Sequence, residues 1–167
     1  LVKHPLVRGF SFTGSTAVGS HLGAMATASM KRLQLELGGK NPLIVLEDFD
    51  PKQAAKIACQ GAFAHAGQIC MASSRVIVER RIYESFCTHL KEEAESLHLG
   101  DIRDPKTAYG PVINGRAASK VREHIQDALE HGATLLTGGN VHHGLTFQPT
   151  VLLEPTRESR VWHEETF

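Results

Sequence analysis

The sequence has few of the features that mark membrane, secreted or nucleic-acid-binding proteins. No apolar run reaches the roughly 20 residues that a helix needs to cross a bilayer, and residues 1–10 form no continuous apolar signal segment. The 18 Lys and Arg residues are balanced by 18 Asp and Glu residues, so no excess of positive charge favours nucleic acid or an anionic membrane. We therefore expect a cytoplasmic protein that binds small molecules or other subunits, and neither nucleic acid nor membrane.

Cysteine is also scarce. The three cysteines, Cys59, Cys70 and Cys87, are odd in number and show no CxxC spacing, which disfavours a disulfide framework and a zinc site. The ten histidines include no HExxH or other ligand spacing, and His142 and His143 are expected in a glycine-rich loop. We expect no metal site, while a reduced thiol with a chemical role stays open.

The periodic segments of the chain alternate between helix and strand patterns. Helices are predicted from Ser15 or Thr16 to about Lys31, and over Pro51–Ala66, Tyr83–Leu97 and Arg116–His131. Strand patterns occupy the lead into Gly14 and the segments Leu33–Leu37, Leu43–Leu46, Arg75–Glu79, Thr134–Thr137 and Thr146–Leu153. This alternation is typical of βαβ units, so we predict an α/β fold with a mainly parallel sheet and flanking helices.

The segment FTGSTAVG, Phe12–Gly19, joins a predicted strand end to a helix start. Backbone N–H groups at such a start can face a phosphate, and Gly14 would allow close approach. A Gly-Ser-Thr turn is also typical of an ordinary helix N-cap, and the segment is not a GxGxxG fingerprint. The local sequence leaves both interpretations open.

Glu36 is a carboxylate near the end of an apolar strand, and Gly38, Gly39 and Lys40 follow it. Partial desolvation where a strand opens onto a turn can tune a general base. Alternatively, Glu36 pairs with Lys40 or faces water from a half-exposed strand.

Cys70 differs from the other two cysteines in its predicted surroundings. It follows the turn Gly67–Ile69 at an irregular junction, whereas Cys59 and Cys87 lie within predicted helices and are expected to be inert core residues. A thiolate at such a junction would be a strong nucleophile toward a carbonyl carbon, so Cys70 is the candidate nucleophile.

Several segments together resemble the aldehyde dehydrogenase superfamily. They are FTGST at Phe12–Thr16, LELGGKNP at Leu35–Pro42, GQIC at Gly67–Cys70, GPVI at Gly110–Ile113, LLTGG at Leu135–Gly139, PTVL at Pro149–Leu152 and EETF at Glu164–Phe167. Glu36 and Cys70 lie 34 residues apart, about the separation between general base and nucleophile in that family. The resemblance covers the whole chain and implies a three-layer αβα fold.

The resemblance also implies roles for individual residues. Cys70 would attack an aldehyde to give a thiohemiacetal, hydride would pass to NAD or NADP, and Glu36 would activate the water that hydrolyses the resulting thioester. The matching cofactor contacts are Gly14, Ser15, Gly19, Leu37, Gly38, Glu165 and Phe167. The expected substrate is a small-molecule aldehyde, and the GQICM form with Met71 suggests an aromatic one.

The resemblance further implies a domain division. Residues 1–38 match the C-terminal part of the NAD(P)-binding domain, and residues 39–167 match the thiol-bearing catalytic domain, truncated at its C-terminus. We therefore expect an internal fragment, inactive alone, of a longer parent that forms a homo-oligomer.

Three other functions are alternatives to hydrolytic aldehyde oxidation. A semialdehyde dehydrogenase that passes the acyl group to coenzyme A is disfavoured, because such members often lack the glutamate that Glu36 matches. A cysteine hydrolase is disfavoured because no His or Asn lies in a recognisable partner motif. A non-catalytic remnant of the fold stays an alternative.

Overall fold

The computed structural model describes all 167 residues, which form two compact units, Leu1–Gly39 and Lys40–Phe167. The boundary between the units lies one residue from the predicted division at residues 38 and 39. The assignment of these units to a cofactor domain and a catalytic domain stays a prediction. None of the helices is both long enough and apolar enough to cross a membrane.

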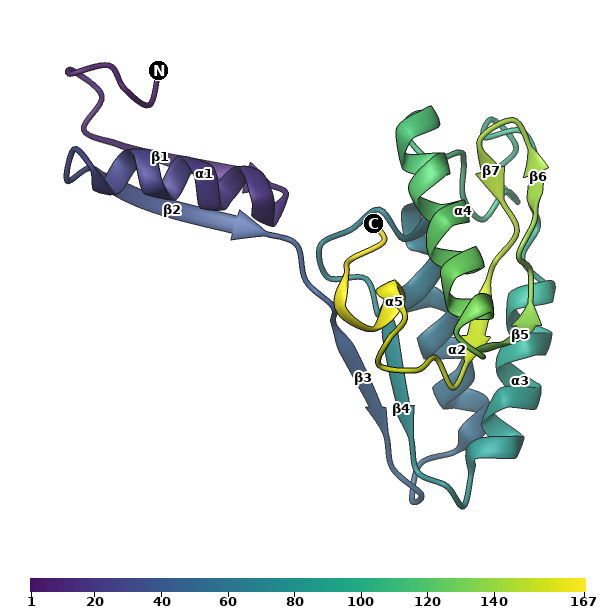
Figure 1. Cartoon of the computed structure of the whole chain (residues 1–167). Helices are drawn as coiled ribbons and strands as arrows, with labels where there is room; N and C mark the ends of the chain where they lie inside the picture. Colours follow the sequence, from purple (N-terminus) through teal and green to yellow (C-terminus); the bar gives the residue numbers. More distant parts are fainter. The chain divides into compact units, whose positions relative to one another are not determined.

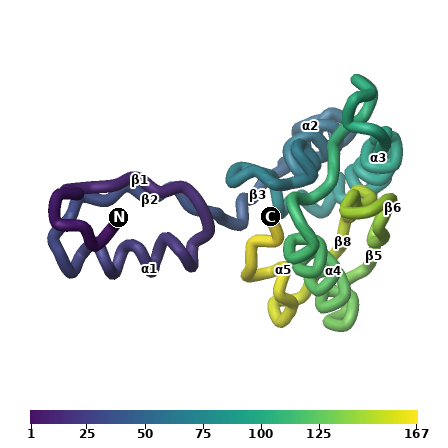
Figure 2. Tube along the Cα trace, turned by 90° about the horizontal axis from the view of Figure 1, so that it is seen from above, coloured from purple at the N-terminus to yellow at the C-terminus, as the bar shows by residue number.

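The first unit is a single βαβ motif. Strand β1 (Gly9–Gly14) leads into helix α1 (Thr16–Thr27), and strand β2 (Arg32–Leu37) returns parallel to β1 (Figure 1). Figure 2 shows α1 along one side of the strand pair. The three elements predicted for this segment are confirmed, although α1 ends about a turn before Lys31.

Small residues let α1 approach β2 closely. A methyl group at Gly19, which is buried, would overlap the side chain of Leu37, and one at Gly23 would lie 3.6 Å from Leu33 and 3.9 Å from Leu35. The alternating leucines of β2 therefore pack under the helix, while the polar residues between them, Gln34 and Glu36, are exposed. This packing explains the strand alternation seen in the sequence.

The first half of the second unit contains the parallel pair β3 (Pro42–Val45) and β4 (Arg75–Val78). Between them in the chain lie helix α2 (Pro51–Phe63) and the short 3-10 helix η1 (Ala64–Gly67), and helix α3 (Tyr83–Glu95) follows β4. Asp50 caps α2 by accepting a hydrogen bond from the Lys52 N–H at 3.0 Å. Pro51 suits the first turn, where its missing N–H costs nothing.

The core of this half lies between α2, α3 and the strands. The buried residues are Val45, Ala54, Ala55, Ala58, Cys59, Phe86, Cys87, Leu90 and Ala94. Because α2 contributes mainly alanines, α3 packs close to it and fills the space with Phe86 and Leu90. The two helices lie side by side in Figures 1 and 2.

The second half begins with helix α4 (Gly115–Glu130), which Asn114 caps. Strands β5 (Thr134–Thr137) and β8 (Val151–Leu153) then pair antiparallel, as do the short strands β6 (Val141–His143) and β7 (Thr146–Phe147). The chain ends with helix α5 (Arg160–His163).

Two sequence-based predictions need correction in this half. His142 and His143 were expected in a loop, but His143 ends β6 and pairs with Thr146 across the Gly144 turn. The single strand predicted over Thr146–Leu153 is two strands, because Gln148–Thr150 interrupts it. Pro149 has no N–H for a strand ladder, which accounts for the break.

The α/β class is confirmed. Of the four strand pairs, the two built from βαβ connections are parallel, and the two near the C-terminus are antiparallel. The helices α1, α2 and α4 keep the bounds expected from sequence within a few residues.

Gly138 is expected to be intolerant of any side chain. Its φ is +80°, and an added methyl group would overlap the Pro149 carbonyl, with the carbonyl carbon at 2.7 Å. Gly138→Ala should therefore lower the free energy of unfolding by about 2–5 kcal/mol, through left-handed backbone strain plus overpacking. Urea unfolding of the full-length protein that carries these residues measures this loss.

Gly132→Ala is the matched control for Gly138→Ala. Gly132 has φ +89°, yet nothing lies within 4 Å of the position of the added methyl group. It should show the backbone strain alone, about 1–2 kcal/mol. Equal losses in the two variants would contradict the role of the Pro149 contact.

Candidate active site

The first unit gathers its predicted site residues at one edge. Because β1 and β2 are parallel and in register, Gly14 lies opposite Leu37, and Thr13 lies opposite Glu36. The carboxyl ends of both strands therefore meet, next to the start of α1. Six predicted residues share this edge or the helix beside it: Gly14, Ser15, Gly19, Glu36, Leu37 and Gly38.

Ser15 and Gly19 have visible structural roles at this edge. The Ser15 hydroxyl caps α1 by accepting a hydrogen bond from the Val18 N–H at 3.4 Å. Gly19 is buried and gives Leu37 room to pack. The cofactor contacts of these two residues stay a prediction.

Cys70 is exposed and lies in the loop between η1 and β4. Its neighbour Met71 is 77% exposed. The backbone N–H of Cys70 donates no hydrogen bond within the protein, and the Ala72 N–H behind it donates to the Ile69 carbonyl at 3.0 Å. The second unit thus presents a free thiol with an unused N–H donor on its surface.

The backbone just before Cys70 takes a sparsely populated conformation. His65, Ala66 and Gly67 all have positive φ, at 52°, 59° and 76°. For residues with a side chain this conformation costs energy, which the surrounding contacts must offset. The helix predicted up to Ala66 therefore ends earlier, at Phe63, and the chain turns sharply toward Cys70.

The side chain of Asn41 binds the backbone of the Cys70 loop. Its amide nitrogen donates to the Cys70 carbonyl at 2.6 Å and to the Ala72 carbonyl at 3.1 Å. Asn41 directly precedes β3, so one residue of the LGGKNP segment fixes the backbone on both sides of Met71.

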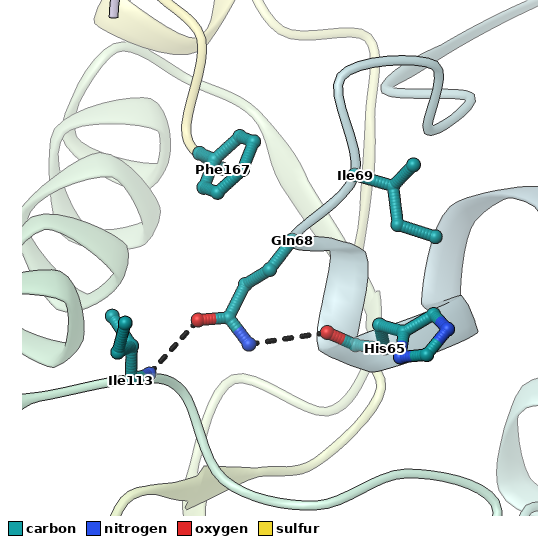
Figure 3. Close-up of a pocket in the computed structure, with 5 residues that line it drawn as sticks. All are labelled: His65, Gln68, Ile69, Ile113 and Phe167. Carbon is teal, nitrogen blue, oxygen red and sulfur yellow. Dashed lines mark hydrogen bonds between the residues drawn. The ribbon is translucent and has the colours of Figure 1, made fainter. Parts of the chain in front are cut away.

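An open pocket of about 580 Å³ lies beside this loop. Its lining residues are His65, Gln68, Ile69, Ile113 and Phe167 (Figure 3). Phe167, predicted to contact the cofactor, is thus placed next to the turn that precedes Cys70. The apolar side chains of Ile69, Ile113 and Phe167 suit an organic ligand better than a fully charged one.

The C-terminal segment that carries Glu165 and Phe167 is anchored to α4. His124 is 1% exposed, and its two ring nitrogens lie 3.0 Å from the Thr166 hydroxyl and 3.3 Å from the Glu164 carboxylate. Burial, reinforced by the charge of Arg160, lowers the pKa of His124. The lowered pKa favours the neutral ring near pH 7, and both ring nitrogens have a partner.

Arg160 adds charged contacts to the same anchor. Its guanidinium forms ion pairs with Glu164 at 3.0 Å and Glu123 at 3.2 Å, and its N–H donates to Asp127 at 2.6 Å. These contacts join α5 and the EETF segment to one face of α4.

Lys40 lies at the start of the second unit and is half-buried. Burial, with the nearby charge of Arg75, lowers the pKa of Lys40 to about 8, and the charge of Glu165 partly opposes this shift. Arg75 itself stacks over the Trp162 ring at 4.7 Å and donates to the Trp162 carbonyl. Lys40, the first residue of β4 and the C-terminal segment therefore lie near one another in this unit.

Cys59 and Cys87 lie in the core, as expected. Burial raises the pKa of Cys59 to about 11, and it also raises the pKa of Cys87. Both thiols stay protonated near neutral pH and are shielded, so Cys70 is the one cysteine on the surface.

Sequence reasoning missed three residues that shape this site: Asn41, Gln68 and His124. Asn41 and Gln68 belong to segments that were recognised, LELGGKNP and GQIC, but their neutral amides suggested no chemistry. His124 gave no signal, because its partners lie 40 and 42 residues away.

The chain is similar to known proteins over its whole length. Residues 1–167 match the model of the aldehyde dehydrogenase family. The chain is 46% identical to a 3-sulfolactaldehyde dehydrogenase of Pseudomonas putida, and the match covers 100% of this chain and 35% of that protein. It is 41% identical to the NADP+ succinate-semialdehyde dehydrogenase of Escherichia coli K12, and the match covers 100% of this chain and 35% of that protein. It is 38% identical to a vanillin dehydrogenase of Pseudomonas fluorescens, and the match covers 100% of this chain and 34% of that protein.

A crystal structure of an NADP-dependent enzyme from E. coli superposes with a TM-score of 0.94 at 41% identity, covering 99% of this chain and 35% of that one. The chain thus spans about a third of the length of the relatives it matches. A match of this kind over every residue places the chain in the aldehyde dehydrogenase family.

Proposed function

We propose that the protein carrying this chain oxidises an aldehyde to the carboxylic acid, with NAD or NADP as hydride acceptor. One observation carries the proposal. In a chain that matches the aldehyde dehydrogenase family throughout, the single exposed thiol, Cys70, lies on the GQIC loop beside an open pocket.

Cys70 performs the first half of the reaction. Its thiolate sulfur adds to the aldehyde carbon, and the carbonyl oxygen becomes an oxyanion. The unused N–H of Cys70 is a donor for that oxyanion. Loss of hydride from this carbon would re-form the carbonyl as a thioester on Cys70. NAD or NADP, when bound, would supply the hydride acceptor.

Glu36 performs the second half. Its carboxylate takes a proton from water, the water oxygen attacks the thioester carbon, and the Cys70 thiolate leaves as the acid forms. Glu36 is exposed near the end of β2, so a water molecule can reach it. The family assignment supports a shared reaction for the two residues, which lie on separate units.

The edge of the first unit is suited to hold part of the cofactor. Parallel strand ends and a helix start meet there, an arrangement that favours phosphate groups. Gly14, Ser15 and Gly19 would lie on the phosphate side, and Leu37 and Gly38 near the nicotinamide. In the second unit, Glu165 and Phe167 would contact the nicotinamide ribose and ring.

The names of relatives include both semialdehyde and vanillin dehydrogenases, so the substrate test covers both classes. The full-length protein is mixed with succinate semialdehyde, vanillin or benzaldehyde and with NAD or NADP, and reduced cofactor is followed by absorbance. We expect reduced cofactor with at least one pair. An aromatic preference would agree with the Met71 interpretation.

The products distinguish hydrolysis from acyl transfer. We expect free carboxylic acid at the same rate with and without coenzyme A, because Glu36 activates water. An acyl-coenzyme A product would instead support the acyl-transferring alternative, and no reduced cofactor with any pair would support a non-catalytic remnant of the fold.

A further inference from the structure

The oxygen and the nitrogen of the Gln68 side-chain amide both form hydrogen bonds near the turn before Cys70. Its oxygen accepts a hydrogen bond from the Ile113 N–H at 2.8 Å, and its nitrogen donates to the His65 carbonyl at 3.1 Å. The same nitrogen lies 3.5 Å from the Pro111 carbonyl. Figure 3 shows the side chain reaching between Ile113 and His65.

The His65 contact restrains the left-handed stretch. Gln68 binds the His65 carbonyl twice, through its backbone N–H at 3.2 Å and through its side chain. His65 and Ala66 both have positive φ, a conformation that needs such support in residues with side chains. The side chain of Gln68 therefore stabilises the turn that sets the position of Cys70.

The Ile113 contact joins that turn to the rest of the unit. Val112, next to Ile113, is buried in a cluster with Ala118 of α4 and Phe147 of β7, and Ala66 packs against the same cluster. Gln68 thus connects the loop, across 45 residues of sequence, to a packed and rigid region.

We infer that Gln68 is a positioning residue that fixes the Cys70 loop against Ile113 for attack on the aldehyde. This inference rests on the proposed function. Together with Asn41, which holds the Cys70 carbonyl, Gln68 fixes the loop on both sides of the nucleophile. Small misplacements of reacting groups lower the rate by large factors, so loss of the Gln68 hydrogen bonds should slow acylation of Cys70.

The test compares two variants in the full-length protein. Gln68→Met keeps the length of the side chain and removes all of its side-chain hydrogen bonds. Gln68→Glu keeps an oxygen for the Ile113 N–H but loses the donor to His65. Gln126→Met is the matched control, because the Gln126 amide binds Glu130 at 2.8 Å on the exposed face of α4.

We expect the pre-steady-state burst of reduced cofactor to slow by about 10- to 100-fold in Gln68→Met and by less in Gln68→Glu. The KM for the cofactor should stay close to the wild-type value, and the midpoint of thermal unfolding should fall by only about 2–4 °C. Gln126→Met should leave the burst unchanged. Partial rescue by glutamate separates positioning from a merely structural role.

An unchanged burst rate in both Gln68 variants would overturn the inference. If Gln68→Met does not fold, the Gln68→Glu burst decides, because that variant keeps the Ile113 bond. Failure of the proposed function gives a different result: wild-type protein would then show no Cys70-dependent reduced cofactor at all.

Discussion

Replacing Cys70 with alanine is expected to abolish aldehyde oxidation, with a loss of at least about 10⁴-fold in the rate of cofactor reduction. The reason is chemical. Without the thiolate, no covalent adduct forms from which hydride can leave, and the residues next to Cys70, Ile69 and Met71, carry no nucleophile for a carbonyl carbon. Stopped-flow absorbance of the full-length protein measures the burst and the steady state together.

Cys59→Ala is the matched control for this prediction. Cys59 is buried in α2 among alanines, so an alanine there removes a thiol without changing the exposed loop. Its turnover should match the wild type. Alkylation by iodoacetamide should label the wild type at Cys70 and leave Cys59 and Cys87 unmodified. A Cys70→Ala protein that still turns over would refute the role given to Cys70.

The elements that carry these residues could be predicted from local sequence. The alternation of Leu33, Leu35 and Leu37 predicts β2 because every second residue packs under α1. Asp50 with Pro51 predicts the start of α2 through capping and a fixed φ. Such signals lie within a few residues of the structure they specify, so sequence alone locates them.

The contacts that shape the site could not be predicted in that way. Gln68 meets Ile113, and His124 meets Thr166, through contacts between segments more than 40 residues apart. No periodic pattern encodes such pairs, since each depends on how whole elements pack. The left-handed turn at His65 and Ala66 is likewise invisible to helix patterning, which runs through it.

The candidate site shows the same division between local and distant information. The motifs predict Cys70 and Glu36 as nucleophile and base, because their separation in the chain is about the one that the resemblance implies. The structure adds what the motifs omit: an exposed thiol with an unused N–H, two amide clamps on its loop and an anchored C-terminal segment. Residue identity suggested the candidate chemistry, whereas the contacts that position these residues could be seen only in the structure.

Glu36→Gln is expected to separate the two halves of the reaction. Glutamine has nearly the shape of glutamate but cannot accept a proton from water, so Cys70 should still form the thioester while hydrolysis slows. The burst of reduced cofactor should keep its wild-type amplitude, and the steady-state rate should fall by about 10²- to 10⁴-fold. Stopped-flow kinetics measure both phases in the full-length protein.

Gln34→Ala controls for changes to the strand itself. Gln34 and Glu36 are two residues apart on β2 and both exposed, so they share one side of the strand and differ in charge. Gln34→Ala should keep the wild-type burst and steady state. In Glu36→Gln, mass spectrometry of the quenched protein should find the acyl group on the peptide that contains Cys70. A variant that loses the burst but hydrolyses the thioester normally would assign Glu36 to the first step instead, because the group that activates water is needed only after hydride has left.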